Sequence, residues 1–191
     1  MNLLAISSTP RINGNSENLL HYAVKPFKDN KDRIRFLILR DMKIHPCTAC
    51  DYCRETGTCK IKDDMIKIYE DFEWCDAMII ASPVYSRNIC SQLMMLFDRH
   101  YAVNIKRPLQ GKPGGAIAVG RGTCGGQTIA INTIYTWMLS CGMICVPGEL
   151  NGMTAVADKP GDILMQENRL RQATILGENI LNVTQRLLTK K

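Results

Sequence analysis

Near the start of the chain stands Asn2-Leu3-Leu4-Ala5-Ile6-Ser7-Ser8-Thr9-Pro10-Arg11-Ile12-Asn13-Gly14-Asn15-Ser16-Glu17. The short apolar run at residues 2–6 predicts a buried first strand. A polar loop follows, and the helix expected after it carries apolar side chains at helical spacing. A strand, a polar loop and a helix start are how α/β proteins bind phosphate, because free backbone N–H groups and the helix dipole favour an anion.

This polar loop has two interpretations. Arg11 can hold a phosphate through two parallel hydrogen bonds. The alternative is a plain turn in which Asn15 or Ser16 caps the helix. Its position directly after the first strand favours phosphate. The loop has neither the glycine fingerprint of dinucleotide sites nor a P-loop motif, which leaves the phosphate of a mononucleotide.

Strands and helices are expected to alternate along the rest of the chain. The expected strands are Arg33 to Leu39, Asp76 to Ala81, Gly114 to Val119 and Met143 to Val146. Helices are expected after Asp63-Asp64, from about Ile89, over 128–141 and over 162–188, with a loop at 148–161. This alternation predicts an α/β fold with a doubly wound, five-stranded parallel sheet in one domain, residues 1–191.

Two further loops follow predicted strands: Ser82 to Asn88, and the glycine-rich Gly120 to Gln127. In a doubly wound sheet, ligands bind outside the carboxyl ends of the strands, where both loops and the first polar loop meet. One ligand could therefore place a phosphate in the first loop and a flat ring between the other two.

A cysteine-rich segment, residues 40–63, interrupts the pattern after the second strand. Cys47, Cys50, Cys53 and Cys59 lie within thirteen residues and are expected to converge. An iron–sulfur cluster is the best candidate ligand. Structural zinc is an alternative, although its cysteines usually form two separated pairs; a third possibility is that the cysteines bind nothing. Cys75, Cys90, Cys141 and Cys145 are expected to be buried apolar residues, and Cys124 lies in the glycine-rich loop.

Composition places few limits on partners. The chain of 191 residues is 46% hydrophobic and 22% charged, with a net charge of +6. No Lys/Arg cluster is dense, so we expect no nucleic-acid partner. We also expect no membrane span and no signal peptide, and hence a cytoplasmic protein without a disulfide framework.

These motifs together resemble the iron–sulfur flavoproteins of anaerobic archaea and bacteria, a branch of the flavodoxin-like NAD(P)H-dependent FMN reductases. The first loop is similar to the FMN-phosphate loop of that family, with Ser8 in place of its usual glycine and Thr9 in place of its serine. Ser82-Pro83-Val84-Tyr85, Asp98-Arg99 and Gly125-Gly126-Gln127 match further family motifs in order.

The resemblance implies a flavodoxin-like fold and a set of cofactor residues. The phosphate of FMN would be held by Thr9, Arg11, Asn15 and Ser16. The ring would be lined by Pro83, Val84, Tyr85, Ser86, Asn88, Gly120, Gly125 and Gly126. Cys47, Cys50, Cys53 and Cys59 would hold a single [4Fe-4S] cluster, because the chain has only one such cysteine run. No catalytic side chain is expected.

The function implied is that of an FMN-dependent oxidoreductase in electron transport. The cluster would accept single electrons from a ferredoxin-like donor and relay them to FMN, which would reduce a quinone, O2 or peroxide. The resemblance also implies a homodimer or tetramer. One alternative is an NAD(P)H-dependent FMN or quinone reductase whose cysteine loop is structural. Another is a redox- or metal-sensing protein without turnover.

Overall fold

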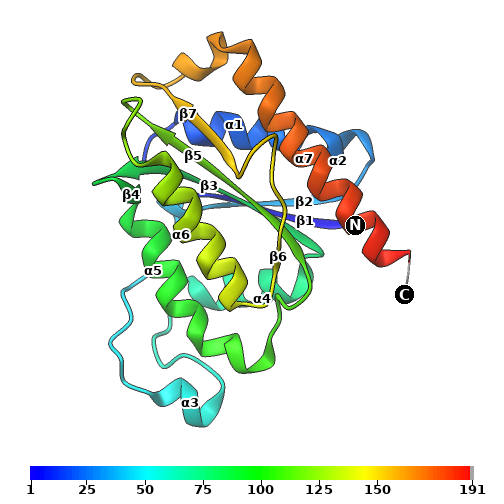
Figure 1. Cartoon of the computed structure of the whole chain (residues 1–191). Helices are drawn as coiled ribbons and strands as arrows, with labels where there is room; N and C mark the ends of the chain where they lie inside the picture. Colours follow the sequence, from blue (N-terminus) through cyan, green and yellow to red (C-terminus); the bar gives the residue numbers. More distant parts are fainter. Residues whose placement is uncertain (190–191) are drawn as a thin grey trace.

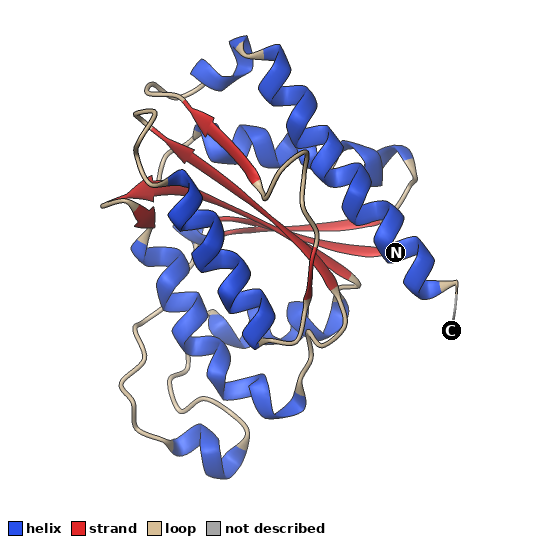
Figure 2. Ribbon diagram, viewed as in Figure 1, coloured by secondary structure: helices blue, strands red, loops and turns tan. Residues whose placement is uncertain are grey.

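A parallel sheet lies at the centre of the molecule, with helices on both faces (Figures 1 and 2). The computed structural model describes residues 1–189, so the last two residues of the predicted domain, Lys190 and Lys191, lie outside it. The sheet order β2-β1-β3-β5-β6 confirms the doubly wound, five-stranded parallel sheet. The elements are β1 (Asn2–Ser7), α1 (Asn15–Ala23), α2 (Lys25–Asp29), β2 (Arg33–Ile38), η1 (Leu39–Asp41), α3 (Tyr52–Thr56), α4 (Met65–Trp74), β3 (Ala77–Tyr85), β4 (Asn88–Ile89), α5 (Ser91–His100), η2 (Tyr101–Lys106), β5 (Pro113–Gly120), α6 (Gln127–Ser140), β6 (Ile144–Cys145), β7 (Met153–Val156), η3 (Asp162–Met165) and α7 (Glu167–Leu188).

The strands separate two apolar cores. Successive side chains of β1 point to opposite faces, so Leu4 and Ile6 enter the core beneath α4, α5 and α6. Leu3 and Ala5 enter the other core, beneath α1, α2 and α7. Because both faces of β1 are covered, its sequence is continuously apolar and not alternating. This explains why the strand is recognisable from sequence without period-two polarity.

The predicted loop at Ser82–Asn88 is mostly strand. β3 continues to Tyr85, and a two-residue turn returns the chain as β4, with Tyr85 opposite Asn88. Both turn residues have positive φ, 48° at Ser86 and 67° at Arg87. Such a turn normally contains Asn or Gly, so its sequence gave no hairpin signal.

The fifth strand is divided into two pieces. β6 pairs with the start of β5 through Ile144 and Cys145, and β7 pairs with its end from Ile117 to Gly120. The predicted strand Met143–Val146 is therefore shorter, and the loop prediction for 148–161 is wrong at Met153–Val156. The chain detours after Pro147, and Tyr135 Oη donates to the carbonyl oxygens of Val146 and Asn151 on both sides of the detour.

The last helix starts later than predicted. Residues 162–165 form the separate η3, and α7 begins at Glu167. α7 packs closely over the junction of α1 and α2, where Gly177 meets the backbone of Ala23. Within residues 1–189, no helix is both long and apolar enough to cross a membrane.

We predict that Gly177→Ala destabilises the fold by roughly 2 kcal/mol. A Cβ at this position would lie 1.9 Å from the carbonyl oxygen of Ala23. The cost of overpacking, about 1–3 kcal/mol or more, exceeds the gain of about 1 kcal/mol from replacing a helical glycine. The free energy of urea unfolding measures the effect. Asn182→Ala, on the exposed side of α7, is the control and should change stability by less than about 0.5 kcal/mol. Equal stability of all three proteins would contradict the tight contact.

Candidate functional site

A cavity of about 270 Å³ opens at the carboxyl edge of the sheet. Nine predicted cofactor residues line it: Thr9, Arg11, Asn15, Ser16, Pro83, Val84, Tyr85, Ser86 and Gly120. Asn88, Gly125 and Gly126 do not. Segments far apart in sequence therefore meet at one place, as the positions of the three loops predict.

The sequence did not point to part of this lining. Ala157 and Asp158 contribute from the segment after β7, and Arg121 from the segment after β5. Arg121 Nε forms a 2.8 Å ion pair with Asp158 Oδ1. The residues after β7 reach this edge because β7 pairs with the end of β5. The sequence of β7, Met153-Thr154-Ala155-Val156, does not alternate between apolar and polar residues, so it offered no strand signal.

The polar loop after β1 is tightly wound. Arg11 N–H donates to Thr9 Oγ1 at 3.3 Å, and Gly14 N–H donates to the carbonyl oxygen of Arg11 at 3.3 Å. A Cβ at Gly14 would lie 2.5 Å from Thr9 Oγ1, so this close approach requires glycine. Asn15 joins the loop to the chain before α7, because its Nδ2 donates to the carbonyl oxygen of Lys159 at 2.8 Å.

The start of α1 has the properties of an anion site. Its N-cap residue is Gly14, and no side chain caps the first turn. Ser16 is buried, and its hydroxyl has no hydrogen-bond partner. A helix N-terminus with uncapped N–H groups and an unused buried hydroxyl fits a bound phosphate, whose oxygens accept from such donors.

Glu17 would oppose an anion here, but its charge is compensated. Arg40, from η1, forms a bidentate ion pair with the Glu17 carboxylate. Ser7 Oγ also donates to that carboxylate, at 3.0 Å. The hydrogen bonding of the Arg40 guanidinium to the Glu17 carboxylate raises the pKa of Arg40 above its ordinary value. The pair leaves the helix N-terminus free to attract an external anion.

The glycine-rich loop packs against the β3–β4 hairpin. A Cβ at Gly126 (φ 100°) would lie 2.3 Å from the carbonyl oxygen of Arg87. Arg87 Nη1 in turn donates to the carbonyl oxygen of Cys124 at 3.3 Å. Asn88 faces α6, where its Oδ1 accepts from Thr133 Oγ1 at 2.8 Å. Asn88 and Gly126 thus shape the hairpin without lining the cavity.

The four clustered cysteines line a second cavity, of about 450 Å³. Cys47 and Cys50 are exposed, and Cys53 and Cys59 are half-buried. Within residues 1–189, no three His, Cys, Asp or Glu side chains are arranged to hold a single metal ion. The thiols instead stand around a wider space, which fits a cluster because each iron takes its own thiolate.

Local backbone geometry turns the cysteines inward. Ala49 and Asp51 have positive φ angles of 49° and 53°, which reverse the chain between successive cysteines. Ala49 N–H donates to Cys47 Sγ at 3.5 Å. A hydrogen bond from the backbone of Tyr52 lowers the pKa of Cys50, whereas burial and then the neighbouring thiols raise that of Cys53.

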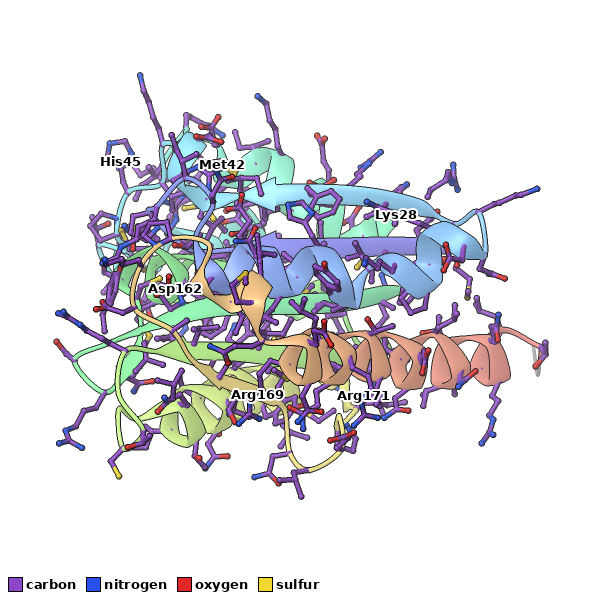
Figure 3. All side chains as sticks on the ribbon, turned by 90° about the horizontal axis from the view of Figure 1, so that it is seen from above. Lys28, Met42, His45, Asp162, Arg169 and Arg171 are labelled. Atoms are coloured by element: carbon purple, nitrogen blue, oxygen red, sulfur yellow. The ribbon has the colours of Figure 1, made fainter. Side chains whose placement is uncertain are left out.

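A buried ion pair fastens this segment to the fold. Arg99, at the end of α5, and Asp63 have side chains only 1% and 2% exposed. Arg99 Nη1 donates to Asp63 Oδ2 and to the carbonyl oxygen of His45, both at 2.8 Å. Asp63 Oδ1 also accepts from the N–H of Met65, at 3.1 Å. Figure 3 shows His45 beyond the end of β2, and Figure 1 shows α3 extending from the sheet beside the end of α5.

The other cysteines largely match expectation. Cys75, Cys90 and Cys141 are buried, Cys145 is half-buried and Cys124 is exposed. Burial raises the pKa of Cys75 to about 12 and that of Cys141 to about 11. Cys90 has polar neighbours at the back of the first cavity, where its Sγ–H donates to the carbonyl oxygen of Ser8 at 3.1 Å.

Comparison with known proteins identifies relatives over nearly the whole chain. Residues 1–156 match the family model for NADPH-dependent FMN reductase. An iron–sulfur flavoprotein of Methanocaldococcus jannaschii is 35% identical over 187 residues, which cover 96% of this chain and 97% of that protein.

Solved structures share the fold at low sequence identity. The structure of RosB with bound 8-demethyl-8-formylriboflavin-5′-phosphate has a TM-score of 0.79 at 15% identity, covering 99% of this chain and 81% of that one. A flavodoxin from the domain Archaea has a TM-score of 0.59 at 15% identity, covering 94% and 99%. The flavodoxin-like part of the fold prediction is confirmed.

We predict that acid loosens the cysteine segment before the sheet. Burial alone would raise the pKa of Asp63, but hydrogen bonds from Arg99, His45 and Met65 lower it from 3.8 to about 2. A lowered folded-state pKa contributes stability that is complete above about pH 4 and lost as the pH falls towards 2, about 2 kcal/mol in all. Amide hydrogen-exchange protection factors of residues 43–61 should therefore fall across this window.

The matched control is Asp63→Asn, which removes the titrating group. Its protection factors should be low already at neutral pH and should change little between about pH 4 and 2. Wild-type protection that stays constant across the same window would contradict the anchoring role of the carboxylate.

Proposed function

The chain belongs to the iron–sulfur flavoprotein family within the NADPH-dependent FMN reductases, and we propose that it is an electron-transfer flavoprotein that binds FMN and one [4Fe-4S] cluster. One observation carries the proposal. The predicted phosphate loop lines one cavity, and all four predicted cluster ligands line another. No residue lines both, so each cavity fits its own cofactor.

The first cavity suits FMN. Thr9, Arg11, Asn15 and Ser16 would hold the phosphate, with the uncapped N–H groups of α1 facing its charge. Pro83 to Ser86 would flank the ring, because the hairpin that carries them forms the opposite wall. The backbone of the hairpin packs closely against Gly126, which supports this wall.

The second cavity suits the cluster. Cys47, Cys50, Cys53 and Cys59 would each bind one iron. When bound, the two cofactors supply one-electron chemistry at the cluster and one- or two-electron chemistry at FMN. This chain's own residues bind, orient and tune them, and no side-chain nucleophile or general base is required.

The proposed partners are those implied by the sequence. A ferredoxin-like protein would donate electrons, and a quinone, O2 or peroxide would accept them. A homodimer or tetramer would allow the cysteine cavity of one subunit to approach the FMN cavity of another. This is consistent with the absence of shared lining residues within the described chain.

A second candidate is an NAD(P)H-dependent FMN or quinone reductase with a structural cysteine loop. The description of the matching family model, NADPH-dependent FMN reductase, favours it. It predicts rapid bleaching of the flavin by NAD(P)H in protein that contains zinc or no metal.

We predict that protein purified without oxygen contains FMN, iron and acid-labile sulfide. Cys50→Ala should lose iron and sulfide but keep FMN, because Cys50 lines only the second cavity. Cys124→Ala is the matched control, since Cys124 is also exposed but lines neither cavity; it should keep all three. Zinc without sulfide in the anaerobic protein would overturn the cluster and support the second candidate.

We also predict that Ser16→Ala weakens FMN binding by roughly tenfold or more, since a hydrogen bond to a charged group contributes about 1.5–3 kcal/mol. Binding of riboflavin, which lacks the phosphate, should change little. Titration of the apoprotein with each flavin, followed by flavin fluorescence, measures both constants. Ser91→Ala, also in the first turn of a helix, is the control. Equal losses for FMN and riboflavin would place Ser16 away from the phosphate.

A further inference from the structure

Arg99 has one N–H group that the ion pair does not use. A guanidinium carries five N–H donors. Nη1 donates to Asp63 Oδ2 and the carbonyl oxygen of His45, and Nη2 donates to Asp63 Oδ1 at 3.0 Å and the carbonyl oxygen of Ile61 at 3.4 Å. The remaining donor, Nε–H, is buried and has no partner.

A buried donor without an acceptor is unusual. Leaving it unpaired carries the full desolvation penalty of the donor, which is larger for a charged group. Folded proteins pair nearly all such groups, so a missing acceptor points to a ligand. The rest of the Arg99 side chain is held in one position by its four other hydrogen bonds, which fixes the place of Nε as well.

The surroundings indicate which acceptor is missing. Arg99 itself lines the cavity of the four cysteines. Ile61, whose carbonyl accepts from Nη2, lies two residues after Cys59 and lines the same cavity. Cys59 lines this cavity together with Cys47, Cys50 and Cys53. A cluster bound in this cavity, with its cysteine ligands, would therefore offer sulfur acceptors near Arg99.

We propose that Arg99 Nε–H donates a hydrogen bond to a sulfur of the bound cluster or of its Cys59 ligand, and that this bond raises the cluster's reduction potential. The proposal rests on the proposed function, since it requires the cluster. Hydrogen bonds to the sulfurs stabilise the more negative reduced state, and they are one of the means by which proteins set cluster potentials. Arg99 is then both the anchor of the cysteine segment and a tuning residue.

A lysine at position 99 cannot both anchor the cysteine segment and donate to the cluster. Its ammonium retains the positive charge but lacks the planar fork that meets Asp63, His45 and Ile61 while leaving Nε–H available. Arg99→Lys should therefore lower the midpoint potential of the cluster.

The test uses anaerobically purified protein grown with arginine that carries 15N only in its guanidinium group. Pulsed EPR of the dithionite-reduced cluster should show a coupling to 15N in the wild-type protein. Arg54→Lys is the control, because Arg54 Nε donates to Tyr101 Oη, Tyr101 lines this cavity, and Arg54 itself does not line it. That variant should keep both the coupling and the midpoint potential, whereas Arg99→Lys should lose the coupling and shift to a lower potential.

The outcomes distinguish a failure of the Arg99 hydrogen bond from a failure of the cluster assignment. A reduced-cluster signal without 15N coupling in the wild-type protein overturns the role of Arg99 and leaves the cluster assignment intact. Loss of the coupling in Arg54→Lys also overturns it. Protein without iron and sulfide overturns the cluster, and this proposal with it. The wild-type measurement decides the question even if Arg99→Lys does not fold.

Discussion

The ion pair between Asp63 and Arg99 is the interaction on which the cysteine segment depends. None of residues 43–61 is fully buried, so the segment has no apolar core of its own. Removing one partner of a buried pair typically costs about 3–5 kcal/mol, because the other charge is left uncompensated. Loss of Arg99 would also remove its hydrogen bonds to the carbonyl groups of His45 and Ile61, which lie at the two ends of the segment. One side chain at the end of α5 thus holds both ends of the segment that carries the four thiols.

The first cavity is held together differently. Its walls are the ends of β1, β3 and β5, whose pairing is continuous with the two apolar cores. The ion pair between Glu17 and Arg40 affects the electrostatics of this cavity, whereas the sheet determines its shape. Hydrophobic burial fixes this site, and a polar anchor fixes the other. The two sites are thus expected to differ in local stability, with the cysteine segment opening more easily.

The different ways in which the two sites are held explain which of their features could be predicted from the sequence. The strand, polar loop and helix at residues 2–24 are local in sequence, so their pattern predicted a phosphate site, and four residues of this loop line the first cavity. The fold class followed from the alternation of strands and helices along the whole chain, and the five other predicted lining residues lie in the two later loops. The spacing of the cysteines predicted that they share one cavity. The partner of Asp63 could not be predicted in this way: Asp63 has the position of a helix cap, and only the tertiary structure brings Arg99 to it. The turn at Ser86-Arg87 and the short β7 are likewise set by contacts with Gly126 and β5.

A weakly packed cysteine segment suits the assembly of a cluster. Thiols must be deprotonated and reachable while iron and sulfide enter, and a segment buried in an apolar core would prevent both. A segment without a fully buried residue, anchored by Arg99 and Asp63, can open more easily than the sheet, so the first cavity would stay formed during cluster assembly. Closing the segment around the cluster would then bring Arg99 Nε–H to its acceptor, and the bond that tunes the cluster would also stabilise the closed segment. Binding of the cluster and order of the segment would then be coupled through this one guanidinium.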